Sequence, residues 1–328
     1  MTTEVLWLPA REIDALHLSM KKIMDCVEEG FTTLGRGEGE LPPKIGIHPR
    51  ENAFIHAMPC YLGGKTDRAG IKCVSAYPAN PAKGLPYIAG LMLLLDPETG
   101  LPQAVMDAGW VTAWRTGAAS GVYARHFGNP ATKTISMIGT GTQARLNLLA
   151  LREVFPQLAS VRCFNIREKS ARTFMEEMGP KLPEIDFRFC AEAQDAVRDA
   201  DVVVSCTPMS ENPKRFIKVD WLRKDALSIA VDYDAAFEAD VFQNAHFTCD
   251  NRNQYVRTQE AGIYFQGGYP GPNDIDADLG DVCAGTTPGI RTGRRGAVLM
   301  GIASHDVMTA DLIYQQALAK GAGTKVEL

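Results

Sequence analysis

The stretch TISMIGTGTQAR, residues 134–145, runs from an apolar β-like segment through two closely spaced glycines into a helix-forming segment. Gly139 permits a tight turn, Gly141 lets the backbone approach an anion, and the small Ala144 lets the new helix pack on its strand. The first N–H groups of such a helix face a phosphate. The stretch therefore predicts a cradle for the phosphates of a dinucleotide.

The chain after residue 130 repeats this alternation of strand and helix. We expect strands at about 134–139, 161–166, 186–190, 201–206, 227–232 and 246–250. This order is typical of a doubly wound parallel sheet of the Rossmann type, which binds ligands at the carboxyl ends of its strands. Residues 263–278 are rich in Gly, Pro and Asp without periodicity and predict a loop, for which a mobile cover is one open role.

The first 130 residues follow a different pattern. Residues 11–34 predict two amphipathic helices, and residues 53–58, 71–77 and 88–95 predict strands of a mostly antiparallel sheet. Residues 111–127 predict a helix rich in small residues, suited to close packing between two domains. The last helix, about 304–320, is expected to return to the first domain. The fold class is therefore α/β, with a Rossmann-type sheet and a second, α+β domain.

Composition narrows the classes of function. The 328 residues carry a net charge of −5 with no basic run, which argues against a nucleic-acid or anionic-membrane partner and favours a small molecule. The start of the sequence lacks a basic segment followed by an apolar one, so we expect a cytoplasmic protein. Eight scattered cysteines predict buried reduced thiols, and the spacing of the six histidines predicts no metal site.

The end of the second Rossmann strand bears on the cofactor. NAD-binding proteins commonly have an acidic residue there, which accepts the ribose hydroxyls and repels a 2′-phosphate. Here Asn165 removes the repulsion and Arg167 offers a positive charge, so NADP(H) is favoured and NAD(H) remains possible. Arg145 and Lys169 are further sources of charge. The alternative is that Arg167 is only a solvated residue of the following helix.

Short motifs along nearly the whole chain resemble the ornithine cyclodeaminase/μ-crystallin family. The likeness is greatest to its archaeal-type alanine dehydrogenase and ketimine reductase branch. In order, the motifs are PPK at 42–44, AMP at 57–59, IK at 71–72, NP at 80–81, GLP at 84–86, ETG at 98–100, RTGAA at 115–119, GTGTQA at 139–144 and LGDV at 279–282.

The resemblance implies roles for particular residues. Lys72 and Arg115 would hold the substrate carboxylate, Arg115 as a planar fork and Lys72 as a point charge. Asp232 would exchange a proton with the imine or amine nitrogen, and Lys72 counts as catalytic beside it. Other residues implied at the substrate are Lys44, His56 and Met58. Those implied at the cofactor are Arg115, Thr116, Gly139, Thr140, Gly141, Thr142, Gln143, Ala144, Asn165, Arg167, Thr207, Pro208, Val231 and Asp232.

The residues around Asp232 support its assignment. Its spacing to Glu238 and Asp240 matches the family's Asp-x5-Glu-x-Asp pattern, and it follows the fifth strand of the predicted parallel sheet. A partly desolvated carboxyl group there can donate or accept a proton. Asp234 is the local rival, and we expect it to cap the next helix instead.

Three departures from the family bear on the substrate or the cofactor. His56 stands where cyclodeaminases have Glu and the alanine dehydrogenase branch has Arg. As a neutral or cationic group it could accept a hydrogen bond from an amine or pair with a second carboxylate, and as an alternative it is only a partly buried strand residue. Lys44 replaces an Arg found in many relatives. Residues 297–300 replace a Phe-Asp-Ser segment, which removes a polar contact near the nicotinamide.

The resemblance implies two domains and a homodimer. Residues 1–120, completed by 304–328, would bind the substrate and dimerise, and residues 121–303 would bind the dinucleotide. The dimer would form through the sheets of the first domain; a monomer with a shielding helix is the alternative.

The leading hypothesis for function is an NAD(P)H-dependent reductase of small 2-imino acids, or an amino acid dehydrogenase in reverse. An ornithine-type cyclodeaminase that forms a cyclic imino acid such as proline and a non-catalytic NADP-binding protein remain open.

Overall fold

The chain forms two compact units in a computed structural model that describes residues 4–209, 212–265 and 267–328. Unit 1 comprises Met1–Arg115 and Gly301–Leu328, and unit 2 comprises Thr116–Met300. The division falls within helix α3, Ala108–Phe127, and directly before helix α10, Ala303–Lys320. Among the described residues, no helix has the length and apolar character needed to cross a membrane.

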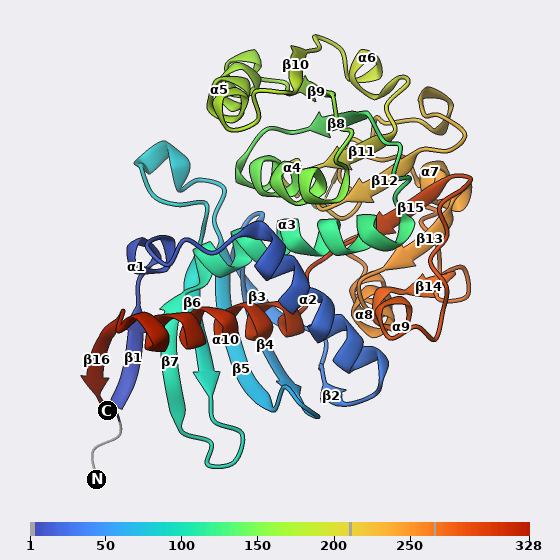
Figure 1. The fold of residues 1–328 in the computed structure, drawn as a ribbon. Coiled ribbons are helices and arrows are strands. Elements are labelled where there is room, and N and C mark those ends of the chain that lie inside the picture. Colours follow the sequence, from blue (N-terminus) through green and yellow to red (C-terminus); the bar gives the residue numbers. More distant parts are fainter. Residues whose placement is uncertain (1–3, 210–211, 266) are drawn as a thin grey trace. The chain divides into compact units, whose positions relative to one another are not determined.

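Unit 1 is built on a mixed sheet (Figure 1). Its strand order is β16-β1-β7-β6-β5-β4-β2, with β3 paired to β4, and every pair is antiparallel except β1 with β7. The three predicted strands are present as β4, β5 and β6, whereas the other five strands were not predicted. The strands are β1 (Glu4–Leu8), β2 (Gly39–Glu40), β3 (Ile45–Arg50), β4 (Ala53–Leu62), β5 (Arg68–Ala76), β6 (Ile88–Leu95), β7 (Pro102–Asp107) and β16 (Thr324–Glu327).

Helices α2, Met20–Gly35, and α10 pack together on one face of this sheet (Figure 1). Ser19 begins α2 by accepting a hydrogen bond from the backbone N–H of Lys22, and apolar side chains such as Phe31 are fully buried. Gly321 ends α10 in the left-handed conformation. The two helices predicted within 11–34 are α1, Ala10–Asp14, and α2.

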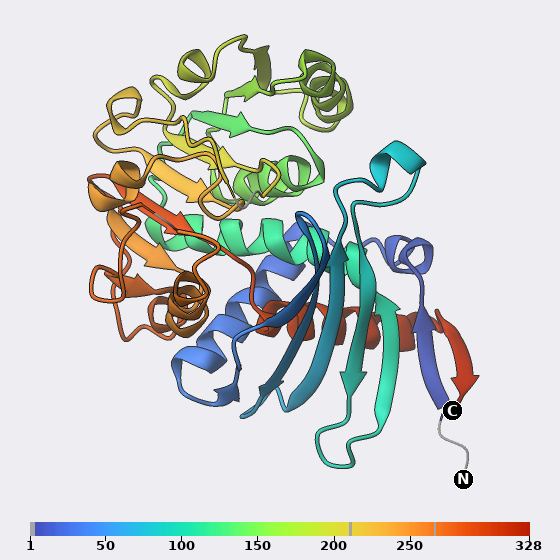
Figure 2. The same ribbon diagram turned by 180° about the vertical axis from the view of Figure 1, so that it is seen from behind.

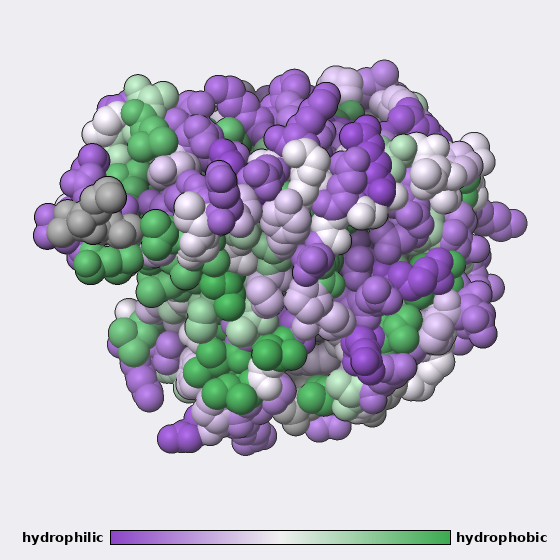
Figure 3. Space-filling model, turned by 90° about the horizontal axis from the view of Figure 1, so that it is seen from below, coloured by the Kyte–Doolittle hydropathy of each residue, from purple (hydrophilic) through white to green (hydrophobic). Residues whose placement is uncertain are grey.

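The opposite face of the sheet, in front in Figure 2, carries apolar side chains in register. Val105 on β7 pairs with Trp7 on β1 and with Leu93 on β6. Leu91 on β6 pairs with Cys73 on β5, and both are exposed. The expectation of buried thiols is therefore wrong for Cys73. Apolar residues also gather at the left of the space-filling view in Figure 3.

Unit 2 contains the predicted Rossmann-type sheet, in which every pair of neighbouring strands is parallel. The order is β10-β9-β8-β11-β12-β15-β13-β14, so the winding direction changes between β8 and β11. The strands are β8 (Thr134–Ile138), β9 (Ser160–Phe164), β10 (Asp186–Phe189), β11 (Val202–Ser205), β12 (Leu227–Ala230), β13 (His246–Cys249), β14 (Ala277–Asp278) and β15 (Arg295–Val298).

The helices of unit 2 alternate with these strands along the chain. Gly117 on α3 has no side chain, and a Cβ there would lie 2.6 Å from the backbone of Leu146 on α4. The absence of a side chain at Gly117 thus allows α3 to pack closely on α4 within unit 2. The helices are α4 (Thr142–Val154), α5 (Glu168–Met178), α6 (Ala193–Val197), α7 (Ala239–Gln243), α8 (Arg252–Glu260) and α9 (Leu279–Cys283), with 3₁₀ turns at Pro81–Lys83 in unit 1 and at Gly179–Lys181 and Val219–Trp221 in unit 2.

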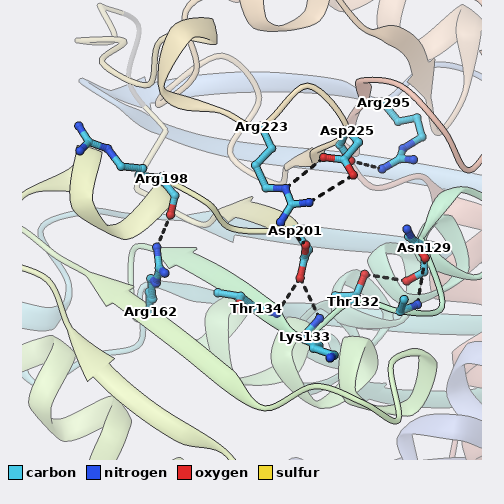
Figure 4. Close-up of polar contacts among 11 residues, drawn as sticks. Asn129, Thr132, Lys133, Thr134, Arg162, Arg198, Asp201, Arg223, Asp225 and Arg295 are labelled. Carbon is cyan, nitrogen blue, oxygen red and sulfur yellow. Dashed lines mark hydrogen bonds and ion pairs between the residues drawn. The ribbon is translucent and has the colours of Figure 1, made fainter.

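A polar network closes the amino end of the parallel sheet (Figure 4). Asp201 accepts hydrogen bonds from the backbone N–H groups of Lys133, at 2.8 Å, and Thr134, at 3.0 Å, and it pairs with Arg223 at 3.1 Å. Arg295, buried in β15, donates to the carbonyl oxygen of Asp225. Strand β15 was not predicted, because its four residues follow a polar, glycine-containing segment. The network lies at the end of the sheet opposite the carboxyl ends of the strands, where sheets of this type bind ligands.

Candidate functional site

The glycine-rich turn connects β8 to α4 and has the shape of an anion cradle. Gly139 has a φ of +85°, and a Cβ there would lie 2.5 Å from the carbonyl oxygen of Cys206. Gly141 precedes the first turn of α4, and a Cβ there would meet no protein atom within 4 Å. No side chain caps this helix, so its first N–H groups are available to an anion. The residues present therefore fit a dinucleotide phosphate.

Arg145 stabilises the turn itself. Its Nη1 donates to the carbonyl oxygens of Thr140, at 2.8 Å, and Gly141, at 2.9 Å, and its Nε pairs with Glu177 at 2.6 Å. These bonds involve Nε and Nη1 of the guanidinium, which the sequence offers as a further source of charge. Arg145 thus stabilises the conformation of the glycine-rich turn.

The residues after β9 lie beside the same turn. Asn165 donates from Nδ2 to the hydroxyl of Thr140 at 2.9 Å and accepts from the backbone N–H of Arg167, also at 2.9 Å. The side chains of Arg167 and Lys169 are exposed, whereas Glu168 pairs with Arg172. Asn165 carries no negative charge, so it does not repel a 2′-phosphate.

Asp232 follows β12 and is buried in a nest of hydrogen-bond donors. Its Oδ1 accepts from the hydroxyl of Ser205 at 2.5 Å, and its Oδ2 accepts from the backbone N–H of Thr207 at 2.8 Å and from the Thr207 hydroxyl at 2.5 Å. Burial raises the pKa of Asp232, although these hydrogen bonds oppose the shift. The side chain is held at the carboxyl end of the sheet with an enhanced tendency to carry a proton.

Asp234 does not cap a helix, contrary to expectation. The next helix, α7, begins at Ala239 with no side-chain cap. Asp234 instead forms an ion pair with Arg215 and accepts a hydrogen bond from the backbone N–H of Phe265 at 2.8 Å. The guanidinium of Arg215 also lies over the ring of Tyr269, 4.8 Å from its centre.

This arrangement anchors the predicted loop at 263–278, which is irregular up to β14; residue 266 lies outside the described residues.

Unit 1 contains two buried cations that meet on one carboxylate. Lys72 lies on β5 between Met58 of β4 and Met92 of β6 and has no exposed surface. Its Nζ lies 2.7 Å from Oδ1 of Asp306 on α10, and the Nε of Arg115 lies 2.9 Å from the same oxygen. Burial and then Arg115 lower the pKa of Lys72 to about 7, against the opposing effect of Asp306.

The guanidinium of Arg115 lies against the backbone of Gly301. Gly301 has a φ of +76°, and a Cβ there would lie 1.8 Å from Nη1 of Arg115. Lys44 reaches the carbonyl oxygen of Gly301 at 3.5 Å. Lys44 and Arg115 therefore both lie against Gly301, shortly before α10.

His56 lies on β4 beside these cations and is neutral near pH 7. Its ring stacks on Phe54 with 4.0 Å between centres, and a Cβ at Gly46 would lie 2.3 Å from its Cδ2. Burial, followed by the charges of Lys44 and His48, lowers the pKa of His56 to about 3. Of the two charge states considered from the sequence, the structure thus favours the neutral one.

The predicted site residues fall into two groups, one in each unit. Unit 1 holds Lys44, His56, Met58, Lys72 and Arg115. Unit 2 holds Thr116, Gly139, Thr140, Gly141, Thr142, Gln143, Ala144, Asn165, Arg167, Thr207, Pro208, Val231 and Asp232.

Sequence reasoning missed four residues that organise these groups: Ser205, Arg215, Gly301 and Asp306. A signal existed for the last two, because Gly301 and Asp306 belong to a Gly-x-Ala-x-x-Asp pattern at the start of the final helix. No short motif marked Ser205 or Arg215.

The chain is similar to known proteins along nearly its whole length. The model of the ornithine cyclodeaminase/mu-crystallin family matches residues 7–321. Alanine dehydrogenase from Archaeoglobus fulgidus is 33% identical over 330 residues, which cover 99% of this chain and 98% of that protein.

Two solved structures have similar folds along their full length. The structure of Δ1-pyrroline-2-carboxylate reductase from Thermococcus litoralis, in complex with NADH and L-proline, has a TM-score of 0.87 and 30% identity, covering 98% of this chain and 100% of that one. An archaeal alanine dehydrogenase dimer with bound NAD has a TM-score of 0.86 and 32% identity, covering 99% of each chain.

Proposed function

The chain belongs to the ornithine cyclodeaminase/mu-crystallin family and is an NAD(P)-dependent oxidoreductase that acts on C=N and CH–NH2 bonds. Within this class, we propose that it reduces small 2-imino acids. The reverse reaction would oxidise an L-amino acid. We further propose that unit 1 binds the substrate and that unit 2 binds the dinucleotide.

The cofactor is proposed to bind at the turn between β8 and α4. Gly141 and the uncapped start of α4 would receive the phosphates, and Asn165 and Arg167 would lie toward the adenosine ribose. We favour NADP(H) because Asn165 carries no negative charge and Arg167 is exposed. The nicotinamide ring, when bound, supplies the hydride that reduces the imine carbon.

The buried pair of Lys72 and Arg115 is the observation that carries the proposal. Two desolvated cations with a single carboxylate between them form a site for a further anion. A substrate carboxylate fits this need, since the fork of Arg115 can bind two carboxylate oxygens and Lys72 can add a point charge.

Asp232 is the proposed proton donor. Its raised pKa means that, at a given pH, a larger fraction of this carboxyl group is protonated than of an ordinary aspartate, and Ser205 and Thr207 hold it in one orientation. In the proposed reaction the proton passes from Asp232 to the imine nitrogen as that nitrogen becomes an amine.

His56 bears on the side chain of the substrate. A neutral imidazole stacked on Phe54 gives no charge to attract a second carboxylate or to balance a distal ammonium group. We therefore favour imino acids with small uncharged side chains, whether formed from a keto acid and ammonia or already cyclic. This argues against the cyclodeaminase alternative, which needs an acidic group for a distal amine.

The proposal is tested by following consumption of NADPH and NADH with a panel of substrates. The panel contains pyruvate, glyoxylate and oxaloacetate with ammonia, pyruvate with methylamine, and cyclic five- and six-membered imino acids. We expect consumption with pyruvate-derived or cyclic imines and a preference for NADPH. Ammonia release from ornithine or lysine with catalytic NAD would overturn the proposal in favour of a cyclodeaminase, and nucleotide binding without turnover would indicate a binding protein.

A further inference from the structure

We propose that Asp306 is a positioning residue that holds Lys72 and Arg115 together as a charge unit to which the substrate carboxylate binds as the second anion. The inference rests on the proposed function and extends it to a residue that touches neither substrate nor cofactor in that proposal.

The geometry of Asp306 is that of a bridge between two cations. One oxygen, Oδ1, lies 2.7 Å from Nζ of Lys72 and 2.9 Å from Nε of Arg115, and all three side chains are buried. Lys72 comes from the sheet and Arg115 from α3, and among the described residues the carboxylate that links them comes from α10. The other oxygen, Oδ2, accepts no hydrogen bond from a described residue.

The charges leave room for one more anion. Two cations and one carboxylate give a local charge of +1. Nη1 of Arg115 is buried and donates to no described residue, so part of the fork remains for a ligand. Without Asp306 the two cations would repel each other in a site of low dielectric constant, and Lys72 would lose its proton.

Among the described residues, the other titratable groups around the bridge carry no negative charge near pH 7. His305 on the same helix is fully buried, and burial together with Arg115 and Lys72 lowers its pKa well below the usual value, so it is neutral. Burial and then Asp306 raise the pKa of the Cys60 thiol to about 12. The titratable and charged groups around the bridge are Lys44, His56, Cys60, Lys72, Arg115 and His305.

The test compares Asp306→Asn with Asp311→Asn on the same helix. Asp311 pairs with Arg68 at 2.6 Å near the surface, so the control loses an ion pair of the same kind outside the site. For Asp306→Asn we expect the KM for the imino acid to rise more than tenfold and the KM for NADPH to stay unchanged. Lys72 must be protonated to hold a carboxylate, so the descending limb of kcat/KM, near pH 7, should move at least one pH unit lower.

The proposal would be overturned if Asp306→Asn kept the wild-type KM and the wild-type descending limb of kcat/KM. Changes no larger than those in Asp311→Asn would overturn it as well. Asp306→Glu keeps the charge on a longer arm, and it should keep the limb while raising KM severalfold. If the Asn variant does not fold, an unchanged KM in the Glu variant overturns the inference.

Calorimetric titration with pyruvate tests the same idea without turnover. The wild-type protein should bind pyruvate more weakly as the pH rises through 7, and Asp306→Asn should lose this binding. An enzyme that is silent on the imine panel but shows this difference would disprove the proposed function and leave the role of Asp306 supported. Equal pyruvate binding by both proteins would disprove the role of Asp306.

Discussion

At the scale of single residues, the environment of Asp232 sets which protonation state it holds. Three donors from Ser205 and Thr207 favour the carboxylate, and complete burial favours the neutral acid more strongly, so the pKa rises. The same residue can therefore serve as proton donor in reduction and as acceptor in oxidation.

Asp232→Asn should lower kcat by about two to four orders of magnitude, the usual contribution of a general acid. The Kd for NADPH, measured by fluorescence titration, should stay near the wild-type value. Asp220→Asn, an exposed carboxylate of the same unit, serves as the control and should behave as wild type. Undiminished turnover in Asp232→Asn would remove Asp232 from the mechanism.

Ser205→Ala should move the pH profile of reduction. Reduction needs the protonated acid, so kcat falls as the pH rises through the pKa of Asp232. The Ser205 hydrogen bond lowers that pKa, and its removal should shift the descending limb of kcat to higher pH. A shift to lower pH would contradict the assignment of Asp232 as the titrating group.

At the scale of elements, the two glycines of the turn between β8 and α4 have different roles, one in the fold and one in ligand binding. Gly139 is required by the fold, because of its positive φ and the nearby carbonyl oxygen of Cys206. Gly141 has open space around it, so its absent side chain matters only when a ligand approaches.

Gly141→Ala should therefore weaken NADPH binding at least about tenfold while leaving the free energy of unfolding nearly unchanged. Gly139→Ala should lower that free energy by about 1–3 kcal/mol, because the backbone conformation is strained for alanine. Urea unfolding and fluorescence titration of both variants separate the two effects. Equal loss of stability in both variants would show that the space at Gly141 is structural.

Asp234 lies two residues after Asp232 and forms an ion pair with Arg215 in the connection between β11 and β12. It also accepts a hydrogen bond from the backbone N–H of Phe265 in the loop after α8. Arg215→Ala leaves a buried carboxylate without its partner and should lower the free energy of unfolding by about 3 kcal/mol. Arg172→Ala breaks an exposed pair with Glu168 and should change it by less than about 1 kcal/mol. A urea unfolding series that ranks the two variants equally would contradict this account.

At the scale of the whole molecule, the outer face of the unit 1 sheet suits a second copy of the chain. Its apolar side chains lie in cross-strand register, and an archaeal relative of similar fold is a dimer with bound NAD. Burial of such a face stabilises an assembly in proportion to the apolar area removed from water. We expect this protein to be a homodimer.

Leu91→Glu should convert the dimer to a monomer, as measured by size-exclusion chromatography with light scattering. Leu91 is 48% exposed on the outer face, and Leu318 on α10 is 52% exposed, so Leu318→Glu is a matched control that should remain dimeric. A wild-type elution profile for Leu91→Glu would contradict an interface through this face.

The sequence by itself determined the Rossmann-type sheet, its glycine turn and the central strands β4, β5 and β6. These features depend on local periodicity and on residues whose backbone needs are visible in a short window. It also singled out Lys72, Arg115 and Asp232 through the family resemblance, although not what surrounds them.

Only the tertiary structure decided which groups surround those residues. Asp306 lies 234 positions after Lys72 in the chain, and the two meet because α10 returns to the sheet of unit 1. Strand β15 is fixed by its place between β12 and β13, and Asp234 pairs with Arg215 instead of capping a helix. Ion pairs, charge states and short central strands depend on burial and on long-range partners, neither of which a local sequence pattern contains.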